Sequence, residues 1–345
     1  MKSWTTTTTL AAAFLAAVAA SPAAAQTVPV TPDNFRRAET HLYFGNSVKE
    51  GGFGKFNHIR EPMPIDHQTV IRANRDTLYS SAVFDLDAGA VTVTLPDAGG
   101  AGGRFMSMQV IDEEQYVPAV HYGAGRHTFT RDGIGTRYVM LGIRTLVDPA
   151  DSDDVKQVHV LQDAIGVEQP GGPGKFGVPA WDPVSQKKVR DALVVLSTTL
   201  PDTKRTFGRR EDVDPVRHLI GTAYAWGGNP ERDALYLNVT PPENDGRTVY
   251  RLTVREVPVD GFWSVSVYGA DGYYHKNDRD AYTVNNLTAK KDADGSVTIQ
   301  FGGDAGDAPN VLPITPGWNY MVRLYRPRAE VLDGTWRFPE AAKQK

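Results

Sequence analysis

Carboxylates with polar neighbours are the residues best suited to chemistry in this sequence. The stretch RANRDTLYSSAVFDL, residues 72–86, places Asn74 and Asp76 directly before a run that alternates like a β-strand. Because side chains alternate sides along a strand, both fall on the same face as the apolar Leu78. Burying an unpartnered carboxylate there costs on the order of a few kcal/mol. Two interpretations stay open: an arginine neutralises Asp76 within a structural network, or Asp76 takes part in a ligand pocket.

Further polar and aromatic residues lie at the beginnings and ends of the expected strands. A carboxylate can act as a general acid or base, while a tyrosine or an arginine stabilises the charge that develops. The expected catalytic residues are Asp76, Asp112 and Tyr79. The expected ligand-binding residues come from both halves of the chain: Arg72, Asn74, Arg75, Gln109, Tyr116, Tyr268, Tyr273, Tyr274, Asn277 and Arg323.

Aromatic residues in the second half offer a different use of the surface. Tyr268, Tyr273 and Tyr274 lie near a turn and are candidates for an exposed platform that would bind a glycan. Aromatic residues are also good strand formers, and alternation assigns Trp263 to the core.

Several common catalytic groups are missing from the sequence. There is no cysteine, which excludes disulfides, thiolate metal sites and a cysteine nucleophile. The eight histidines form no HxH or HExxH pattern, so we expect no metal site and no cofactor. No G-x-S-x-G motif occurs, and Ser107 and Ser264 lie inside expected strands. His121 and His127 flank the probable turn YGAGR; they could pair across it, although two exposed loop histidines are the favoured interpretation.

Residues 1–25 have the pattern of a signal peptide. Lys2 is followed by a short apolar stretch at 10–20 and by three alanines before Gln26. The apolar stretch is too short to span a bilayer, so we expect cleavage, a periplasmic or secreted protein and no membrane span afterwards. Loss of Lys2 changes the formal net charge from −4 to −5. Such a mild charge offers no basic face for nucleic acid.

Periodicity predicts the order of the elements. We expect an N-terminal helical segment at 26–66, a first β domain at 67–150, a helical connector at 151–228 and a second β domain at 229–345. The fold class is therefore mainly β with a helical insert (α+β), with two antiparallel β-sandwich or jelly-roll-like domains. The turn-rich segment 169–180 is either a lid over a cleft or a surface connection.

A faint internal repeat leaves two interpretations open: the two β domains are a duplicated unit, or the short match arose by chance. The pattern F-x-S-x-x-V at 105–110 recurs at 262–267. A second pattern, a tyrosine followed six residues later by an arginine, occurs at Tyr138 and Arg144 and again at Tyr320 and Arg326.

Longer motifs resemble a known pair of domains. The stretch NRDTLYSSAVFDLDAGAVTVTLPD, together with RFMSMQVIDEEQYV and RTLVDPADSDDVKQVHVLQDAI, resembles the bacterial domain of unknown function 1254. DGFWSVSVYGADGYYHKNDRDAYTVNNLTAKKDADGSVTIQFGG, followed by NVLPITPGWNYMVRLYRPRAEVLDGTWRFPEA, resembles its usual partner, the domain of unknown function 1214. The resemblance implies two antiparallel β domains with helices between or beside them, and it implies no established reaction. The segment before Asn74 is shorter than is usual for the family.

Two hypotheses about function remain. The first is an exported soluble hydrolase or lyase that acts on an envelope-side substrate by carboxylate acid–base chemistry. The alternative is a non-catalytic β-sandwich module that binds a glycan or a protein. An enzyme predicts a carboxylate with a perturbed pKa in a concave pocket, whereas a binder predicts an exposed aromatic platform. The expected partner is a small-molecule or glycan ligand, and a homo-oligomer is left open.

Overall fold

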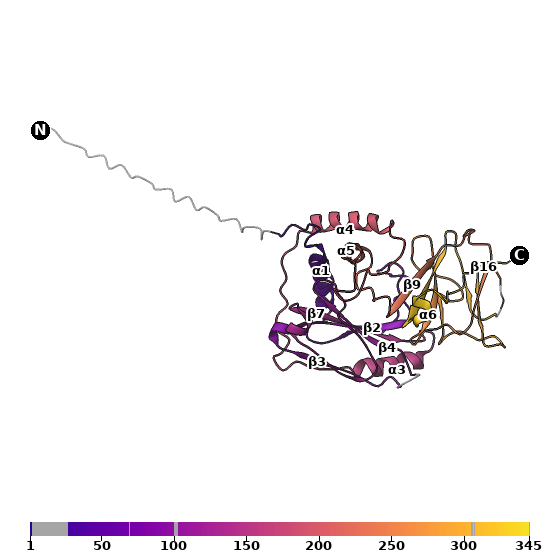
Figure 1. Cartoon of the computed structure of the whole chain (residues 1–345), viewed down its shortest axis with the longest axis horizontal. Coiled ribbons are helices and arrows are strands. Elements are labelled where there is room, and N and C mark those ends of the chain that lie inside the picture. The colour runs from indigo at the N-terminus through magenta and orange to yellow at the C-terminus, as the bar shows by residue number, and fades with distance from the viewer. Residues whose placement is uncertain (2–26, 69, 100–102, 305, 307, 345) are drawn as a thin grey trace.

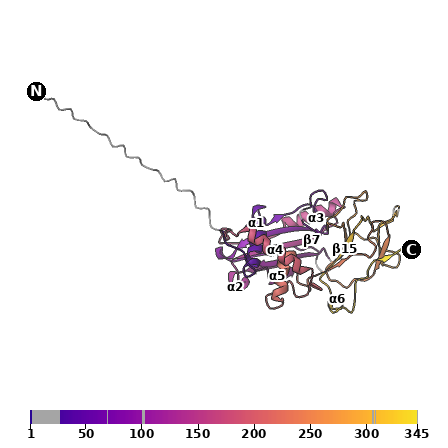
Figure 2. The same cartoon turned by 90° about the horizontal axis from the view of Figure 1, so that it is seen from above.

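The computed structural model describes residues 1, 27–68, 70–99, 103–304, 306 and 308–344. The expected signal peptide at 1–25, apart from Met1, lies outside the described residues and stays a prediction. Two β-rich bodies lie side by side along the long axis, and the longer helices gather on the first (Figures 1 and 2). In the part of the chain that the structure describes, no helix is both long and apolar enough to cross a membrane.

The first domain is a sandwich of two antiparallel sheets. The larger sheet has the spatial order β1 (Asn57–His58), β2 (Thr77–Asp85), β7 (Tyr138–Leu146), β4 (Met106–Asp112) and β5 (Val120–Tyr122). The smaller sheet has the order β6 (Gly125–Phe129), β3 (Val91–Leu95) and β8 (Gly166–Glu168). The sequence VTVTL of β3 alternates buried and half-buried residues, so its valines join Phe84 and Leu141 in the core between the sheets.

The second domain is also a sandwich of two sheets, which are antiparallel except for one parallel strand pair. One sheet has the order β12 (Thr283–Asn285), β11 (Trp263–Tyr268), β15 (Asn319–Tyr325) and β9 (Ala234–Val239). The other has the order β14 (Val311–Leu312), β13 (Val297–Phe301), β10 (Tyr250–Val254) and β16 (Ala342–Lys343). Trp318, Tyr320 and Phe301 stack in the core between these sheets, where Trp263 is also buried, as its strand position predicts.

The two domains share one connectivity. In the first, β2 pairs with β7, β3 with β6 and β4 with β5; in the second, β9 pairs with β15, β10 with β13 and β11 with β12. After the last of these strands, β8 returns to β3 and β16 returns to β10. Nested pairs of this kind, distributed over two sheets, are the jelly-roll arrangement. The expected mainly β, α+β fold with a duplicated jelly-roll-like unit is therefore confirmed.

The strand register corrects one part of the expected repeat. Ser107 of β4 lies opposite Arg144 of β7, and Ser264 of β11 lies opposite Arg323 of β15. The F-x-S-x-x-V motifs are thus structural equivalents. The counterpart of Arg144 is Arg323, and the match with Arg326 is wrong because Arg326 lies beyond the end of β15.

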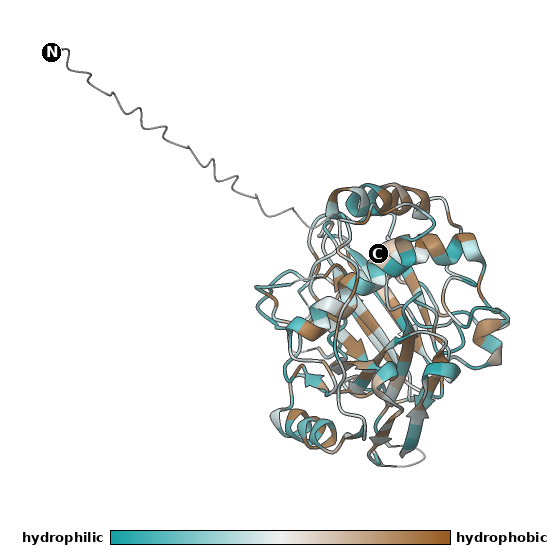
Figure 3. Ribbon diagram, turned by 90° about the vertical axis from the view of Figure 1, so that its left-hand side faces the viewer, coloured by the Kyte–Doolittle hydropathy of each residue, from teal (hydrophilic) through white to brown (hydrophobic). Residues whose placement is uncertain are grey.

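Helices from two separate segments form one layer on the first sandwich. They are α1 (Phe35–Lys49), α4 (Pro183–Ser197) and α5 (Pro215–Tyr224), while α3 (Ser152–Asp163) lies apart and α2 (Arg131–Ile134) and α6 (Ala329–Leu332) are single turns. Both α4 and α5 begin with an aspartate cap followed by proline, as their sequences predict. Phe44 of α1 packs on Val83, Ile111 and Met140 of the larger sheet. Hydrophilic and hydrophobic residues alternate along these helices, as expected for a layer with one solvent-facing side (Figure 3).

The segment 169–180 is fastened to the end of the first sandwich. The Gln169 side chain donates a hydrogen bond to the carbonyl oxygen of Asp85 at 2.9 Å. The Lys175 N–H donates to Asp85 Oδ2 at 3.1 Å, and the Tyr138 hydroxyl donates to the Lys175 carbonyl at 2.8 Å. These bonds make the segment a fixed surface connection rather than a lid.

Candidate functional site

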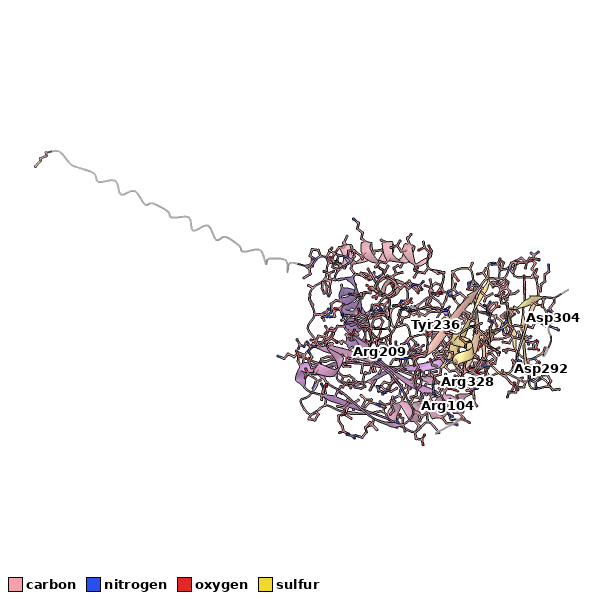
Figure 4. All side chains as sticks on the ribbon, in the orientation of Figure 1. Arg104, Arg209, Tyr236, Asp292, Asp304 and Arg328 are labelled. Atoms are coloured by element: carbon pink, nitrogen blue, oxygen red, sulfur yellow. The ribbon has the colours of Figure 1, made fainter. Side chains whose placement is uncertain are left out.

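One pocket contains a carboxylate that the sequence singles out. A cavity of about 270 Å³ opens where β4 ends, between α2 and residues 209–211. Asp112 and Tyr116 line it together with Arg209 and Arg210. Figure 4 labels Arg209 in the first domain. The structure therefore brings two of the predicted site residues together in a concave site.

Asp112 has one engaged and one available oxygen. Its Oδ1 accepts hydrogen bonds from the N–H groups of Glu114 at 2.8 Å and Tyr116 at 2.9 Å. Its Oδ2 accepts none from the described residues, and Asp112, although only 5% exposed, lines the pocket. Burial raises the pKa of Asp112 to about 6, although the two N–H donors and Arg210 act in the opposite direction. Asp112 therefore changes its charge near neutral pH.

Tyr116 is the aromatic centre of this pocket. Its ring stacks on His218 with centroids 4.4 Å apart, and the Arg210 guanidinium carbon lies 4.5 Å from its centroid. His218 is fully buried and is held by the carbonyl oxygens of Thr206 and Glu114, each at 3.0 Å. A cation next to an aromatic face and a carboxylate can balance negative charge on a bound molecule.

Sequence reasoning missed Arg210 and His218. Both come from the predicted helical connector, about a hundred residues after β4, so no local pattern joins them to Asp112. The only available signal is the arginine pair in the run GRRED at 208–212.

Asp76 lies in a different place, where the two domains meet. It is fully buried, and its Oδ1 accepts hydrogen bonds from Thr283 Oγ1 at 2.9 Å and Asn285 Nδ2 at 3.0 Å. Its Oδ2 has no hydrogen-bond partner in the described residues. The inward orientation is confirmed, but the expected arginine clamp is wrong, because both partners are neutral donors from the second domain.

Arg323 is the arginine of this buried network that Asp76 affects electrostatically, and it binds neutral oxygens. It donates to Ser266 Oγ at 2.8 Å, to the Tyr268 hydroxyl at 2.7 Å and to the backbone carbonyl of Arg72 at 2.8 Å. Tyr268 and Tyr274 are also buried, and both hydroxyls donate to the carbonyl oxygen of Ala73. The expected exposed platform is therefore wrong for these two tyrosines: the N-terminal part of the first domain covers them.

Two further predicted residues contact Arg144, on the face of the larger sheet that α1 covers farther along the strands. Tyr79 has its ring centroid 5.6 Å from the Arg144 guanidinium carbon, and Gln109 Oε1 accepts a hydrogen bond from Arg144 at 2.7 Å. Asn74 donates to the Tyr325 hydroxyl at 3.2 Å. Asn74, just before β2, thus contacts the end of β15 in the second domain.

The remaining predicted ligand-binding residues are spread along the same boundary. Arg72 is half-buried and donates to a side chain of β9. Arg75 donates to a backbone carbonyl and lies 5.3 Å from the centroid of Tyr282. Tyr273 is half-buried in a turn, and Asn277 borders a small pocket of about 100 Å³ at the edge of the second domain. They do not converge on one point.

The predicted catalytic residues do not form one site. The register pairs Thr77 of β2 with Leu146, and Asp112 of β4 with Val139, at the opposite end of β7. At about 3.3 Å per residue, the ends of β7 lie roughly 20 Å apart. Asp76 and Asp112 therefore cannot act on the same atom, and Tyr79 belongs to the Arg144 cluster. Among the described residues, no group of three or more histidine, aspartate or glutamate side chains could hold a metal ion.

Comparison with solved structures shows the fold. The VPA0106 protein from Vibrio parahaemolyticus superposes with a TM-score of 0.70 at 20% identity, covering 91% of this chain and 98% of that one. A putative uncharacterized protein from Burkholderia cenocepacia gives a TM-score of 0.49 at 13% identity, covering 91% and 87%. No curated protein matches the sequence. The similarity to the first structure extends through both domains and shows the fold alone, without indicating an activity.

Family models match each domain separately. Residues 53–134 match "Protein of unknown function (DUF1254)" and residues 240–329 match "Protein of unknown function (DUF1214)". The first match covers most of the larger sheet and ends in α2, at the edge of the Asp112 pocket. The second contains β10 to β15. The chain thus pairs a domain of the DUF1254 family with a domain of the DUF1214 family, as its motifs predict.

Proposed function

We propose that this protein is an exported hydrolase or lyase whose acid–base group is Asp112. The observation that carries the proposal is a buried carboxylate with a pKa of about 6 and one free oxygen, placed in a pocket. A general base works best when its pKa lies near the working pH. At neutral pH Asp112 is largely ionised and can accept a proton from water or from a carbon acid.

Arg210 supports this assignment as the charge-stabilising group. It lies over Tyr116 and within electrostatic reach of Asp112. Arg209, by contrast, is already engaged by Asp212 at 2.7 Å. We propose that Arg210 stabilises the negative charge that develops on the substrate when Asp112 removes a proton.

The size of the cavity limits the substrate. About 270 Å³ is just below the range of roughly 300–1,000 Å³ that is typical of ligand pockets. The pocket suits a small polar molecule or one terminal unit of a larger one. The glycan-binding alternative loses its main support, because Tyr268 and Tyr274 are buried.

Export forms part of the proposal. Its support is the signal-peptide pattern of residues 1–25. Fractionation of the native host tests it: we expect a mature chain that begins near Gln26 in the periplasm or the medium. An uncleaved chain in the cytoplasm would contradict export without affecting the assignment of Asp112.

Asp112→Asn tests the chemistry, because the amide oxygen keeps the hydrogen bonds from Glu114 and Tyr116 and loses the titratable group. Asp245→Asn is a matched control: Asp245 accepts from the N–H groups of Arg247 and Thr248 in a similar turn outside the pocket. Small chromogenic esters report hydrolysis, and ultraviolet absorbance of uronic-acid oligosaccharides reports the double bond that a lyase forms. We expect turnover that rises through a pH of about 6, falls at least about 100-fold in Asp112→Asn and persists in Asp245→Asn.

Two results would contradict the proposal. The first is equal turnover by wild type and Asp112→Asn. The second is no turnover by wild type together with no perturbation of the pocket residues in NMR spectra recorded with each probe.

A further inference from the structure

The duplication gives each domain the same row of three residues across its strands. In each row a central strand carries an arginine, and its two neighbouring strands place a tyrosine and a serine opposite that arginine. The rows are Tyr79, Arg144 and Ser107 in the first domain and Tyr236, Arg323 and Ser264 in the second. The equivalent phenylalanines Phe105 and Phe262 touch one another at 5.0 Å between centroids. Contact between equivalent positions is what a two-fold arrangement produces, so the two rows approach each other across the domain boundary.

The row of the second domain is closed. Arg323 is 2% exposed and donates to two hydroxyls and to the carbonyl oxygens of Arg72 and Ala73. The segment before β2 therefore fills the position in front of this arginine with backbone oxygens. No ligand can reach Arg323 without displacing that segment.

The row of the first domain has no such plug. Among the described residues, Arg144 donates to Gln109 at 2.7 Å and weakly to the Gly227 carbonyl at 3.4 Å, with no carboxylate at ion-pair distance. Arg144 is partly exposed, as is Tyr79. A methyl group added at Gly142, two residues earlier on the same face of β7, would meet no atom within 4 Å. Arg144 thus lacks a counter-ion among the described residues, and open space begins two residues away at Gly142.

Tyrosine hydroxyls surround this open position. Burial raises the pKa of Tyr325, Tyr236 and Tyr79 raise it further, and Arg144 and Arg323 lower it, so all five groups lie within electrostatic reach. Asn229 donates to the Tyr236 hydroxyl at 3.0 Å and fixes its direction. Figure 4 shows Tyr236 on the side of the second domain that faces the first.

We propose that Arg144 binds the carboxylate of a small aromatic acid in the open space beside Gly142, on the face of the larger sheet of the first domain that the helices cover. One guanidinium with no counter-ion matches one singly charged carboxylate, and its planar donors suit two carboxylate oxygens. The surrounding tyrosine rings provide flat apolar surface for an aromatic ring. This site is separate from the Asp112 pocket and does not depend on the proposed enzyme activity.

Calorimetry of the full mature chain with benzoate tests the proposal. Benzamide is the matched neutral probe, because it keeps the shape of benzoate and removes the charge. We expect benzoate to bind with a Kd of about 0.1–1 mM and benzamide to bind at least about tenfold more weakly. Inorganic phosphate, which prefers more than one cation, should also bind at least about tenfold more weakly than benzoate.

Two variants locate the binding. Gly142→Leu fills the open space without removing the charge. Gly177→Leu is its control, because Gly177 also has open space at its Cβ position and lies in the segment 169–180. We expect Gly142→Leu to bind benzoate at least about tenfold more weakly while melting within about 2 °C of wild type. Gly177→Leu and Asp112→Asn should bind like wild type. Arg144→Gln should lose binding, and Gly142→Leu decides the question if Arg144→Gln does not fold.

The proposal is overturned if wild type does not bind benzoate, if benzamide binds equally well, or if Gly142→Leu retains the wild-type affinity. Tighter binding of phosphate than of benzoate would also overturn it, because the site would then recognise a phosphate ligand.

Discussion

Asp76 carries a charge that the interior accepts because donors from the other domain reach it. Thr283 and Asn285 bind one carboxylate oxygen, and Asp76 is the anion whose electrostatic effect reaches the buried Arg323. An unpaired buried cation is more costly than a pair that is only partly satisfied. Asp76 and Arg323 thus stabilise one another without direct contact.

Asp76→Asn should therefore lower the free energy of unfolding at neutral pH by roughly 1–3 kcal/mol. The amide oxygen can still accept from Thr283 and Asn285, but Arg323 loses its anion. Denaturant unfolding of wild type and variant measures the difference, with the exposed Asp278→Asn as a control. An unchanged midpoint would show that the charge of Asp76 does not stabilise the fold.

Asp112→Asn should act in the opposite direction. In the folded state the pKa of Asp112 is about 6, above the value of about 3.9 for an exposed aspartate, so the folded chain binds more protons between these values. The stability that comes from the neutral acid is present below about pH 4 and is lost as the pH rises through about 6. We expect Asp112→Asn to be more stable than wild type by roughly 1–3 kcal/mol near pH 8 and equal to it near pH 4. A variant less stable than wild type at pH 8 would contradict this.

Single residues could be predicted only where local pattern decides their environment. The alternation of side chains along the strand correctly predicted that Asp76 points inward, because this alternation depends only on neighbouring residues. Its partners and the burial of Tyr268 depend on segments about two hundred residues away, which no local pattern reports. Asp112 and Tyr116 could be selected from the end of a strand, whereas Arg210 could not.

At the scale of elements, the turn between β5 and β6, which belong to different sheets, brings two histidines together. The rings of His121 and His127 lie 4.1 Å apart between centroids, and both side chains are half-buried. The favoured interpretation of two exposed loop histidines is therefore wrong. Burial lowers the pKa of both, and the neighbouring His127 lowers that of His121 further.

This pair should make the first domain sensitive to mild acid. Because the folded pKa values lie below the ordinary value of about 6.5, the unfolded chain binds more protons as the pH falls below that value. The free energy of unfolding therefore decreases as the pH falls, until the pH is below the pKa values of the folded state. Replacing both histidines with glutamine should flatten the dependence of stability on pH below about 6.5. An equally steep dependence in the variant would remove the pair as its source.

Element type followed from the sequence more readily than element boundaries. An aspartate followed by proline predicts the start of α4 and of α5, and the alternating sequence VTVTL predicts β3. Helix α3 has Asp151 as its N-cap residue, whereas α1 begins at Phe35 without a side-chain cap from Asn34, so local residue type alone does not set these ends. Two-residue strands such as β16 exist only through tertiary pairing.

At the scale of the molecule, the domain boundary is a core of its own. Phe105 and Leu146 of the first domain pack on Phe262 and Tyr325 of the second. Phe262 and Tyr325 stack with centroids 4.2 Å apart. The Asp76 and Arg323 networks lie beside this apolar contact, so the two sandwiches share both apolar and polar interactions.

The two domains should therefore unfold in one cooperative transition. Thr283→Val removes one donor to Asp76 from the second domain and should lower the midpoint of the whole chain by the same amount in circular dichroism and in tryptophan fluorescence. Thr298→Val is a control on the outer face of the second sandwich. Separate transitions, with only one affected by Thr283→Val, would show that the boundary does not couple the domains.

The central claim, that Asp112 is an acid–base group in a pocket, can be tested before any substrate is known. Carboxyl carbon NMR of the mature chain, with Asp112 assigned by comparison with Asp112→Asn, gives its titration directly. The structure predicts a midpoint at a pH of about 6. A midpoint near 4, the ordinary value for an exposed aspartate, would contradict the account.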